Sequence, residues 1–144
     1  MLLAAGALAS YRVLRPSTSE IIAVAPSGWL WGETTDNRGF EESLAERISI
    51  EFANQRIARV VGWPIMMRYR TGGQEFRQIA TGVGATKMLL IRSASSGVAV
   101  FLLDGVSGQK MWVNEYPAQN NQVDLARTIV KDFVAKQKGA SEPR

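Results

Sequence analysis

Three glutamates, Glu41, Glu42 and Glu46, come nearest in type and spacing to a catalytic carboxylate pair. Two carboxylates can act as general acid and general base when a cleft separates their pKa values. The surrounding residues, however, repeat an apolar side chain every four positions, which indicates a helix with one buried stripe. The glutamates fall outside that stripe. The sequence therefore favours a solvated helix surface, and no catalytic residue is predicted.

Two glycine-rich stretches, Gly72-Gly73 and Gly82-Val83-Gly84, could approach a phosphate group. Neither completes a dinucleotide-binding or Walker pattern, which needs further glycines at fixed offsets. Gly84 instead follows a short run with helical spacing, where a glycine commonly ends a helix. We therefore expect a helix terminus and no cofactor.

A basic–aromatic cluster is formed by Arg68, Tyr69 and Arg70, with Arg77 close behind. Guanidinium groups beside an aromatic ring can hold phosphate or stack on bases. Because a nucleic-acid site usually neutralises several phosphates, this cluster is small for the task. We expect an exposed connection here, and single-stranded nucleic-acid binding remains the alternative function.

Trp29 and Trp31 are the residues that could bind a protein partner. They follow a predicted buried strand, in a segment expected to be a loop, and exposed aromatic side chains there would form an interaction patch. The same two rings could equally cover the open end of the core. The sequence leaves both interpretations open.

Composition removes several kinds of chemistry. The chain has 144 residues, with no Cys and no His, so thiolate nucleophiles, disulfides, imidazole bases and the commonest zinc ligands are excluded. A hydrophobic content of 46% suits one compact domain. The net charge of +4 is modest, and part of it lies in the carboxy-terminal segment. We do not expect nucleic acid to be the main partner.

The predicted elements follow the order β-α-β-α-β-β-β-α. Glycine, proline and polar clusters separate short apolar runs from three segments with helical spacing. The last helix can be capped by Asn120 or Asn121. The fold class is α/β, an α+β sandwich with a mixed five-stranded sheet and three helices. Strands are expected at residues 20–25, 56–62, 87–92, 98–103 and 110–116.

The clearest local pattern is a β-hairpin around Asp104-Gly105-Val106-Ser107-Gly108. Apolar runs lie on both sides, and Asp, Gly and Ser are typical of a chain reversal. Nothing in the hairpin looks like a nucleophile, a base or a ligand set, so its predicted role is to build the sheet.

The amino-terminal residues 1–15 are apolar up to Arg12 and are followed by Arg15 and Pro16. The apolar run is shorter than the ~20 residues of a spanning helix and has no early positive side chain, as a secretory signal would. We expect part of a transmembrane helix, with a short amphipathic helix or a signal as alternatives. The expected organisation is this segment at 1–15, a linker at 16–19, one domain at 20–135 and a disordered tail at 136–144.

Four motifs in the same order as a known family make the chain resemble the TolB amino-terminal-like domain. A first strand ends in proline at residues 22–26, and a Gly-apolar-x-Glu-x-Leu signature occupies residues 39–44. A helix ends at residues 79–85 (IATGVGA), and the hairpin LLDGVSGQKMWVNEY occupies residues 102–116. The residues from Trp29 to Trp31 depart from the polar loop that is usual in the family.

The resemblance implies a non-catalytic domain with a fold like an anticodon-binding domain, without cofactor or metal. Such modules occur outside the cytoplasm in membrane-anchored bacterial regulators, including CadC-type winged-helix transcription regulators and class III adenylate cyclases. We therefore expect a membrane-tethered, periplasmic interaction or sensory module with a protein partner, anchored through residues 1–15. The sequence specifies no small-molecule ligand.

Overall fold

A single mixed sheet organises the chain, which a computed structural model describes at residues 20–31, 38–70, 75–94, 96–117 and 121–141. Its order is β2-β1-β3-β4-β5. β1 is parallel to β2 and β3, whereas β3, β4 and β5 are antiparallel. The predicted α+β class and the five strands are confirmed. The strands are β1 (Ile21–Pro26), β2 (Arg59–Val60), β3 (Lys87–Ala94), β4 (Gly97–Asp104) and β5 (Lys110–Pro117).

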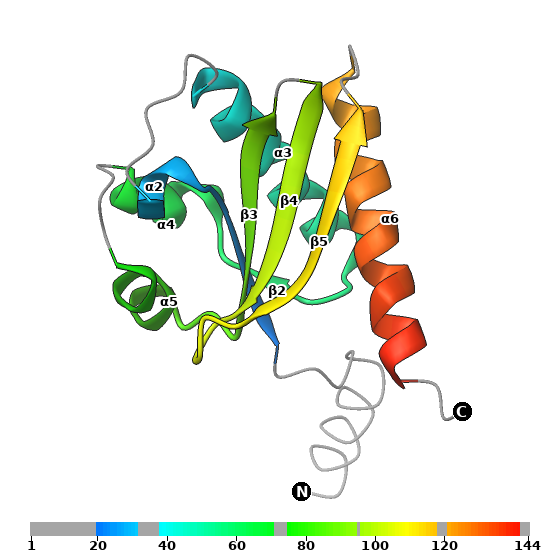
Figure 1. Ribbon diagram of the computed structural model, residues 1–144. Helices are drawn as coiled ribbons and strands as arrows, with labels where there is room; N and C mark the ends of the chain where they lie inside the picture. Colours follow the sequence, from blue (N-terminus) through cyan, green and yellow to red (C-terminus); the bar gives the residue numbers. More distant parts are fainter. Residues whose placement is uncertain (1–19, 32–37, 71–74, 95, 118–120, 142–144) are drawn as a thin grey trace, which may run out of the picture.

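Helices cover the two faces of the sheet unequally (Figure 1). The long helices α3 (Arg38–Gln55) and α6 (Gln122–Ser141) pack on one face. The short helices α2 (Gly28–Trp31), α4 (Trp63–Met66) and α5 (Phe76–Val83) pack on the other face, beside β1 and β3. Because side chains alternate along a strand, Val24 and Leu89 enter the first core, while Ala23 and Met88 enter the second.

The expected helix ends are confirmed at two positions. Gly84 has a φ of +70° and follows α5, and its N–H donates to the carbonyl of Thr81. This left-handed backbone conformation is strained for any residue that has a Cβ, which is why glycine ends the helix. Asn121 precedes α6, and its Oδ1 accepts the N–H of Val123 at 2.9 Å. Asn121 therefore caps the helix.

Several boundaries differ from the prediction. The segment after β1, expected to be a loop, begins with α2, and β2 is only two residues long. Pro64 lies in the first turn of α4, where its missing N–H costs nothing, so the chain leaves the sheet early. A 3₁₀ turn, η1 (Met67–Tyr69), follows. α6 continues to Ser141, so residues 136–141 are helical rather than disordered.

No helix in the described part of the chain is long and apolar enough to cross a membrane. The transmembrane segment expected at residues 1–15 lies outside the described residues, as do the linker up to Ser19 and the tail beyond Ser141.

The β4–β5 hairpin is confirmed, and Asp104 holds its turn. Oδ1 of Asp104 accepts the backbone N–H groups of Val106 and Ser107, both at 2.9 Å. The N–H of Gly108 donates to the Asp104 carbonyl at 2.9 Å. The hydrogen bonds to the carboxylate, first from Ser107 and then from Val106, lower the pKa of the Asp104 carboxyl below its ordinary value. Asp104 therefore fits the turn best as a carboxylate.

Replacing Asp104 by asparagine is expected to destabilise the domain near neutral pH and to matter progressively less in acid. The folded pKa is depressed, so the stabilisation is present above the unfolded value of 3.8 and is lost as the pH falls through the folded pKa. Urea unfolding of both proteins from about pH 7 to about pH 2 measures the difference. A stability difference that stays constant across this range would contradict the assignment.

Candidate interaction surface

The sheet face beside the short helices is left partly open along β4 and β5. Phe101 of β4 and Val113 of β5 are cross-strand partners on this face, and Met111 lies beside them near a β-bulge. Val113 is 44% exposed and Met111 is 49% exposed, although both are apolar. Large apolar side chains that remain exposed side by side are typical of an interaction surface.

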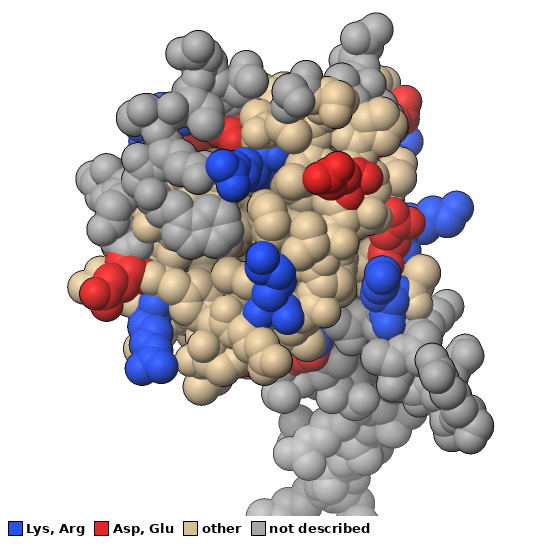
Figure 2. Space-filling view, in the orientation of Figure 1, with Lys and Arg blue, Asp and Glu red and all other residues tan. Residues whose placement is uncertain are grey.

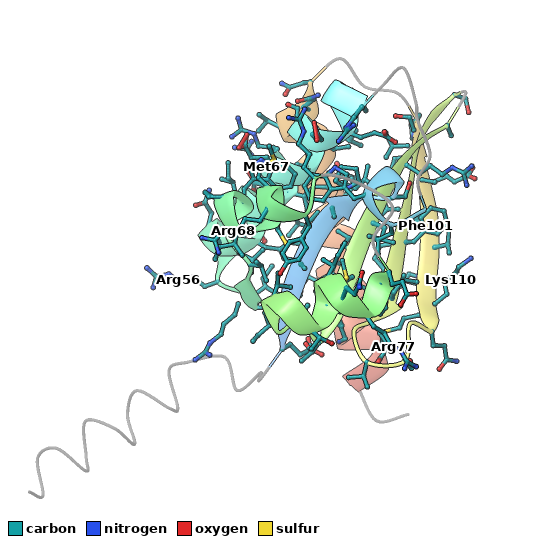
Figure 3. The ribbon with its side chains drawn as sticks, turned by 90° about the vertical axis from the view of Figure 1, so that its left-hand side faces the viewer. Arg56, Met67, Arg68, Arg77, Phe101 and Lys110 are labelled. Carbon is teal, nitrogen blue, oxygen red and sulfur yellow. The ribbon has the colours of Figure 1, made fainter. Side chains whose placement is uncertain are left out.

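Charged side chains are few around this open face. Figure 2 shows it as a largely uncharged area with separate basic and acidic residues. The ammonium group of Lys110 lies 5.3 Å from the centre of the Phe101 ring, a cation–π distance. In Figure 3 Phe101 and Lys110 lie together on the strands, on one side of α5. The face therefore combines apolar contacts with a positive charge.

The opposite side of β5 is fixed to α6. The hydroxyl of Tyr116 donates a hydrogen bond to Oδ2 of Asp132 at 2.8 Å. Burial and the hydrogen bond to this carboxylate raise the pKa of the Tyr116 hydroxyl, so it remains protonated as a structural donor. Tyr116 and its neighbours facing α6 thus hold β5 in place while Met111 and Val113 point outward.

Trp29 is a core residue, so the structure rules out the first of its two interpretations, an exposed ring that binds a partner. It is 1% exposed and stacks on Trp63 with ring centres 5.4 Å apart. Its indole N–H points to Oε2 of Glu42 at 3.3 Å. The other interpretation of the sequence, a ring that covers the end of the core, is confirmed for Trp29. The side chain of Trp31 lies outside the described residues.

Glu41 and Glu42 are buried, which corrects the prediction of a solvated helix surface. They are 3% and 9% exposed, because the first turn of α3 packs against α2 and the end of β3. Oε2 of Glu41 accepts the N–H of Ser93 at 2.7 Å. Oε2 of Glu42 accepts the Nε–H of Arg70 at 2.7 Å. The period of the apolar stripe could not reveal this, since both positions lie beside the stripe; Glu46 is exposed as predicted.

Both buried carboxylates serve as acceptors for groups from other parts of the fold. Each is held by fixed donors from other elements, and Arg38 adds a second cation 3.7 Å from Glu42. Within the described residues, no group of three acidic side chains could hold a metal ion. The arrangement ties α3 to α2, to β3 and to the segment after η1.

The basic–aromatic residues do not gather on one patch. Arg70 is paired with Glu42, and Tyr69 is partly buried against α5, where its ring lies close to Gly82. Arg68 and Arg77 are exposed, but Figure 3 shows them on separate elements, η1 and α5, well apart in the view. The structure thus places two of the four arginine and tyrosine side chains in internal contacts.

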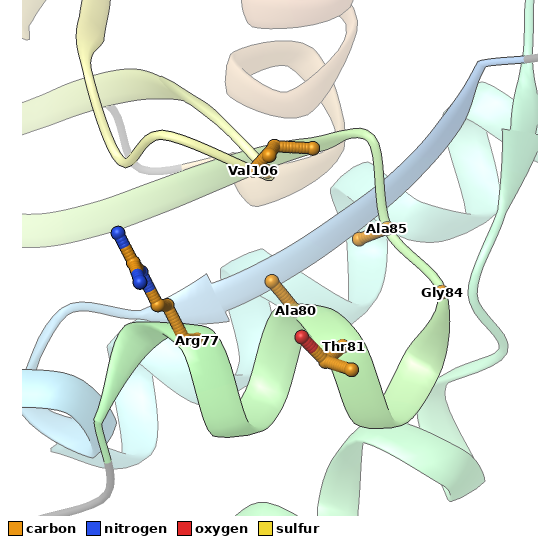
Figure 4. A pocket seen from close by; sticks show the side chains of 7 residues that line it. Arg77, Ala80, Thr81, Gly84, Ala85 and Val106 are labelled. Carbon is orange, nitrogen blue, oxygen red and sulfur yellow. The ribbon is translucent and has the colours of Figure 1, made fainter.

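A shallow groove of about 530 Å³ lies between α5 and the hairpin turn. Figure 4 shows Arg77, Ala80 and Thr81 on its helix side and Val106 on its turn side. Arg77 is its single charged lining residue, and the lining contains no carboxylate or other base beside Thr81. The groove therefore holds no nucleophile–base pair of the kind that covalent catalysis requires.

The chain matches no protein-family model and no curated protein. Among solved structures it is similar to the lipoprotein GNA1162 from Neisseria meningitidis, with 12% identity and a TM-score of 0.44. That match covers 83% of this chain and 99% of the other. It is also similar to the PelC dodecamer from Paraburkholderia phytofirmans, with 14% identity and a TM-score of 0.41. The L103M variant of PelC gives a TM-score of 0.43, and both PelC matches cover 76% of this chain and 80% of the other.

Sequence reasoning missed the open face as a candidate site. Its signal was present in the period of two along residues 110–116. Trp112 and Tyr116 alternate with Met111 and Val113, so both sides of this strand carry apolar residues. An edge strand that is apolar on both faces predicts a second apolar contact beyond the core.

Proposed function

We propose that this chain is a non-catalytic interaction module, tethered to a membrane and located outside the bacterial cytoplasm. The observation that carries the binding role is the open face of β4 and β5, where Met111 and Val113 remain exposed beside Phe101. Such a face is stabilised when a partner covers it, because apolar surface is then removed from water.

The absence of catalysis is part of the proposal. The buried carboxylates Glu41 and Glu42 are engaged by donors from other elements, and Tyr116 is held by Asp132. These contacts support structural roles for these three buried ionisable groups. A sensory or docking role needs no further reactive group.

The location is supported by the sequence rather than by the fold. Residues 1–14 are mostly apolar and are followed by Arg15 and Pro16, only a few residues before β1 begins. Together with the four TolB-like motifs, this segment supports a domain that follows a membrane helix directly, as part of a membrane-anchored regulator.

Protease treatment of spheroplasts tests the location. The full chain with a carboxy-terminal tag is expected to be digested in intact spheroplasts, while a cytoplasmic marker protein survives. A matched variant without residues 2–15 is expected to be protected, because it lacks the expected anchor. If the full chain is digested only after the spheroplasts are lysed, the proposed location is wrong.

A further inference from the structure

The outer edge of β5 has no partner strand among the described residues. β5 is the last strand in the sheet order and pairs only with β4. The N–H of Glu115 donates to the side chain of Asn114 at 3.0 Å instead of to β4. Since alternate residues of an antiparallel strand point their N–H groups the same way, the N–H of Val113 also points outward. An edge of this kind can accept another strand.

The charges on β5 select one partner and one direction. On the open face the strand carries Lys110 at its beginning and Glu115 near its end, with Val113 between them. If a second β5 ran parallel, Lys110 would face the same cation of its copy. If it runs antiparallel, Lys110 of each copy lies beside Glu115 of the other, and Val113 lies against Val113. The edge is therefore complementary to itself in the antiparallel direction.

The end of the strand sets the length of this contact. Pro117 occupies an outward position, where the missing N–H leaves nothing unpaired in the isolated domain but stops further pairing. The usable edge thus runs from about Met111 to Glu115, and the amide of Asn114 must release the Glu115 N–H when a strand binds.

We propose that β5 pairs antiparallel with β5 of a second copy of this chain, around a two-fold axis at Val113, to form one continuous sheet. The inference rests on the proposed binding role and adds to it a contact at the strand edge, beside the open face. The hydrogen bonds across the edge supply the contact, and the reciprocal Lys110–Glu115 pairs fix its direction. The apolar face then continues from one copy to the other.

Sedimentation of the full chain in a mild detergent, over a range of concentrations, tests the pairing. The unmodified chain is expected to show a monomer–dimer equilibrium. Val113→Pro is expected to be monomeric at the same concentrations, because it removes an outward N–H that does not bond to β4. An unchanged circular dichroism spectrum and melting temperature would show that this variant is folded.

A charge exchange tests the direction. Lys110→Glu and Glu115→Lys are each expected to weaken dimerisation about tenfold, because each places like charges side by side at both ends of the contact. The double variant Lys110→Glu, Glu115→Lys is expected to restore the dimer. Equal weakening in the double variant would overturn the proposed register.

Cross-linking locates the contact, because the chain contains no cysteine of its own. Val113→Cys is expected to form a covalent dimer with a short bismaleimide. Val106→Cys is the control, since Val106 is 77% exposed but lies in the hairpin turn, away from the axis. A chain that stays monomeric, or larger assemblies that Val113→Pro leaves intact, would overturn the pairing. Digestion in spheroplasts would still support the proposed location in that case, so the two failures are distinguishable.

Discussion

Replacing Gly105 by alanine is expected to lower the free energy of unfolding by about 3 kcal/mol, because the hairpin has no room for a methyl group. A Cβ at this position would overlap the carbonyl oxygen of Ala85 and lie 2.6 Å from the carbonyl carbon of Thr86. Both are backbone atoms, so they cannot turn aside as a flexible side chain would. The N–H of Gly105 also donates to the Thr86 carbonyl at 2.7 Å, and that hydrogen bond would be distorted.

Gly39→Ala is the matched control for this change. Gly39 lies in the first turn of α3, and a Cβ there would have no atom within 4 Å. Alanine is expected to leave the stability unchanged or to raise it by about 0.5–1 kcal/mol, since it reduces the freedom of the unfolded chain. Urea unfolding compares the two variants. Equal effects would show that the hairpin can move away from the segment before β3.

Replacing Glu42 by alanine is expected to lower the free energy of unfolding by about 2 kcal/mol, because several donors lose their acceptor at once. The indole N–H of Trp29 would remain buried without its partner, and Arg70 would lose its ion pair. Glu42→Gln keeps an oxygen acceptor and loses the charge, so an intermediate cost is expected. The measurement is again the free energy of unfolding in urea.

Two comparisons separate this carboxylate from an ordinary surface residue. Glu46→Ala, one turn further along α3 and exposed, is expected to change the stability by no more than about 0.5 kcal/mol. A double-mutant cycle with Arg70→Ala measures the coupling between Glu42 and Arg70 directly. If Glu42→Ala and Glu46→Ala have the same effect, Glu42 does not tie α3 to its neighbours.

The sequence predicted the elements whose signals are local. Gly84, Asn121 and the Asp104 turn each act through backbone groups within a few residues, so residue type and spacing were enough. The order of the five strands and of α3, α5 and α6 followed from the same local signals, whereas the short helices α2 and α4 were not predicted. These parts of the fold could be predicted without knowledge of any contact between residues that are distant in the sequence.

The contacts between residues that are far apart in the sequence could not be predicted in this way. Glu42 meets Trp29 and Arg70, which lie 13 and 28 residues away along the chain. Their meeting depends on how α3 begins against α2, and no periodicity encodes it. The exposure of Val113 likewise depends on the short helices stopping beside β3 and leaving β5 uncovered, which is a property of the assembled layers.

The ends of the described chain constrain how a paired domain could sit on a bilayer. β1 begins and α6 finishes at the same end of the sheet (Figure 1). A rotation of 180° about an axis normal to the sheet moves these ends to opposite poles of the pair. If residues 1–15 anchor each copy, as proposed, both anchors can enter one bilayer only if the strands run along its plane. The ten-stranded sheet would then lie flat over the lipid headgroups, attached to the bilayer at two opposite ends, instead of standing perpendicular to the membrane.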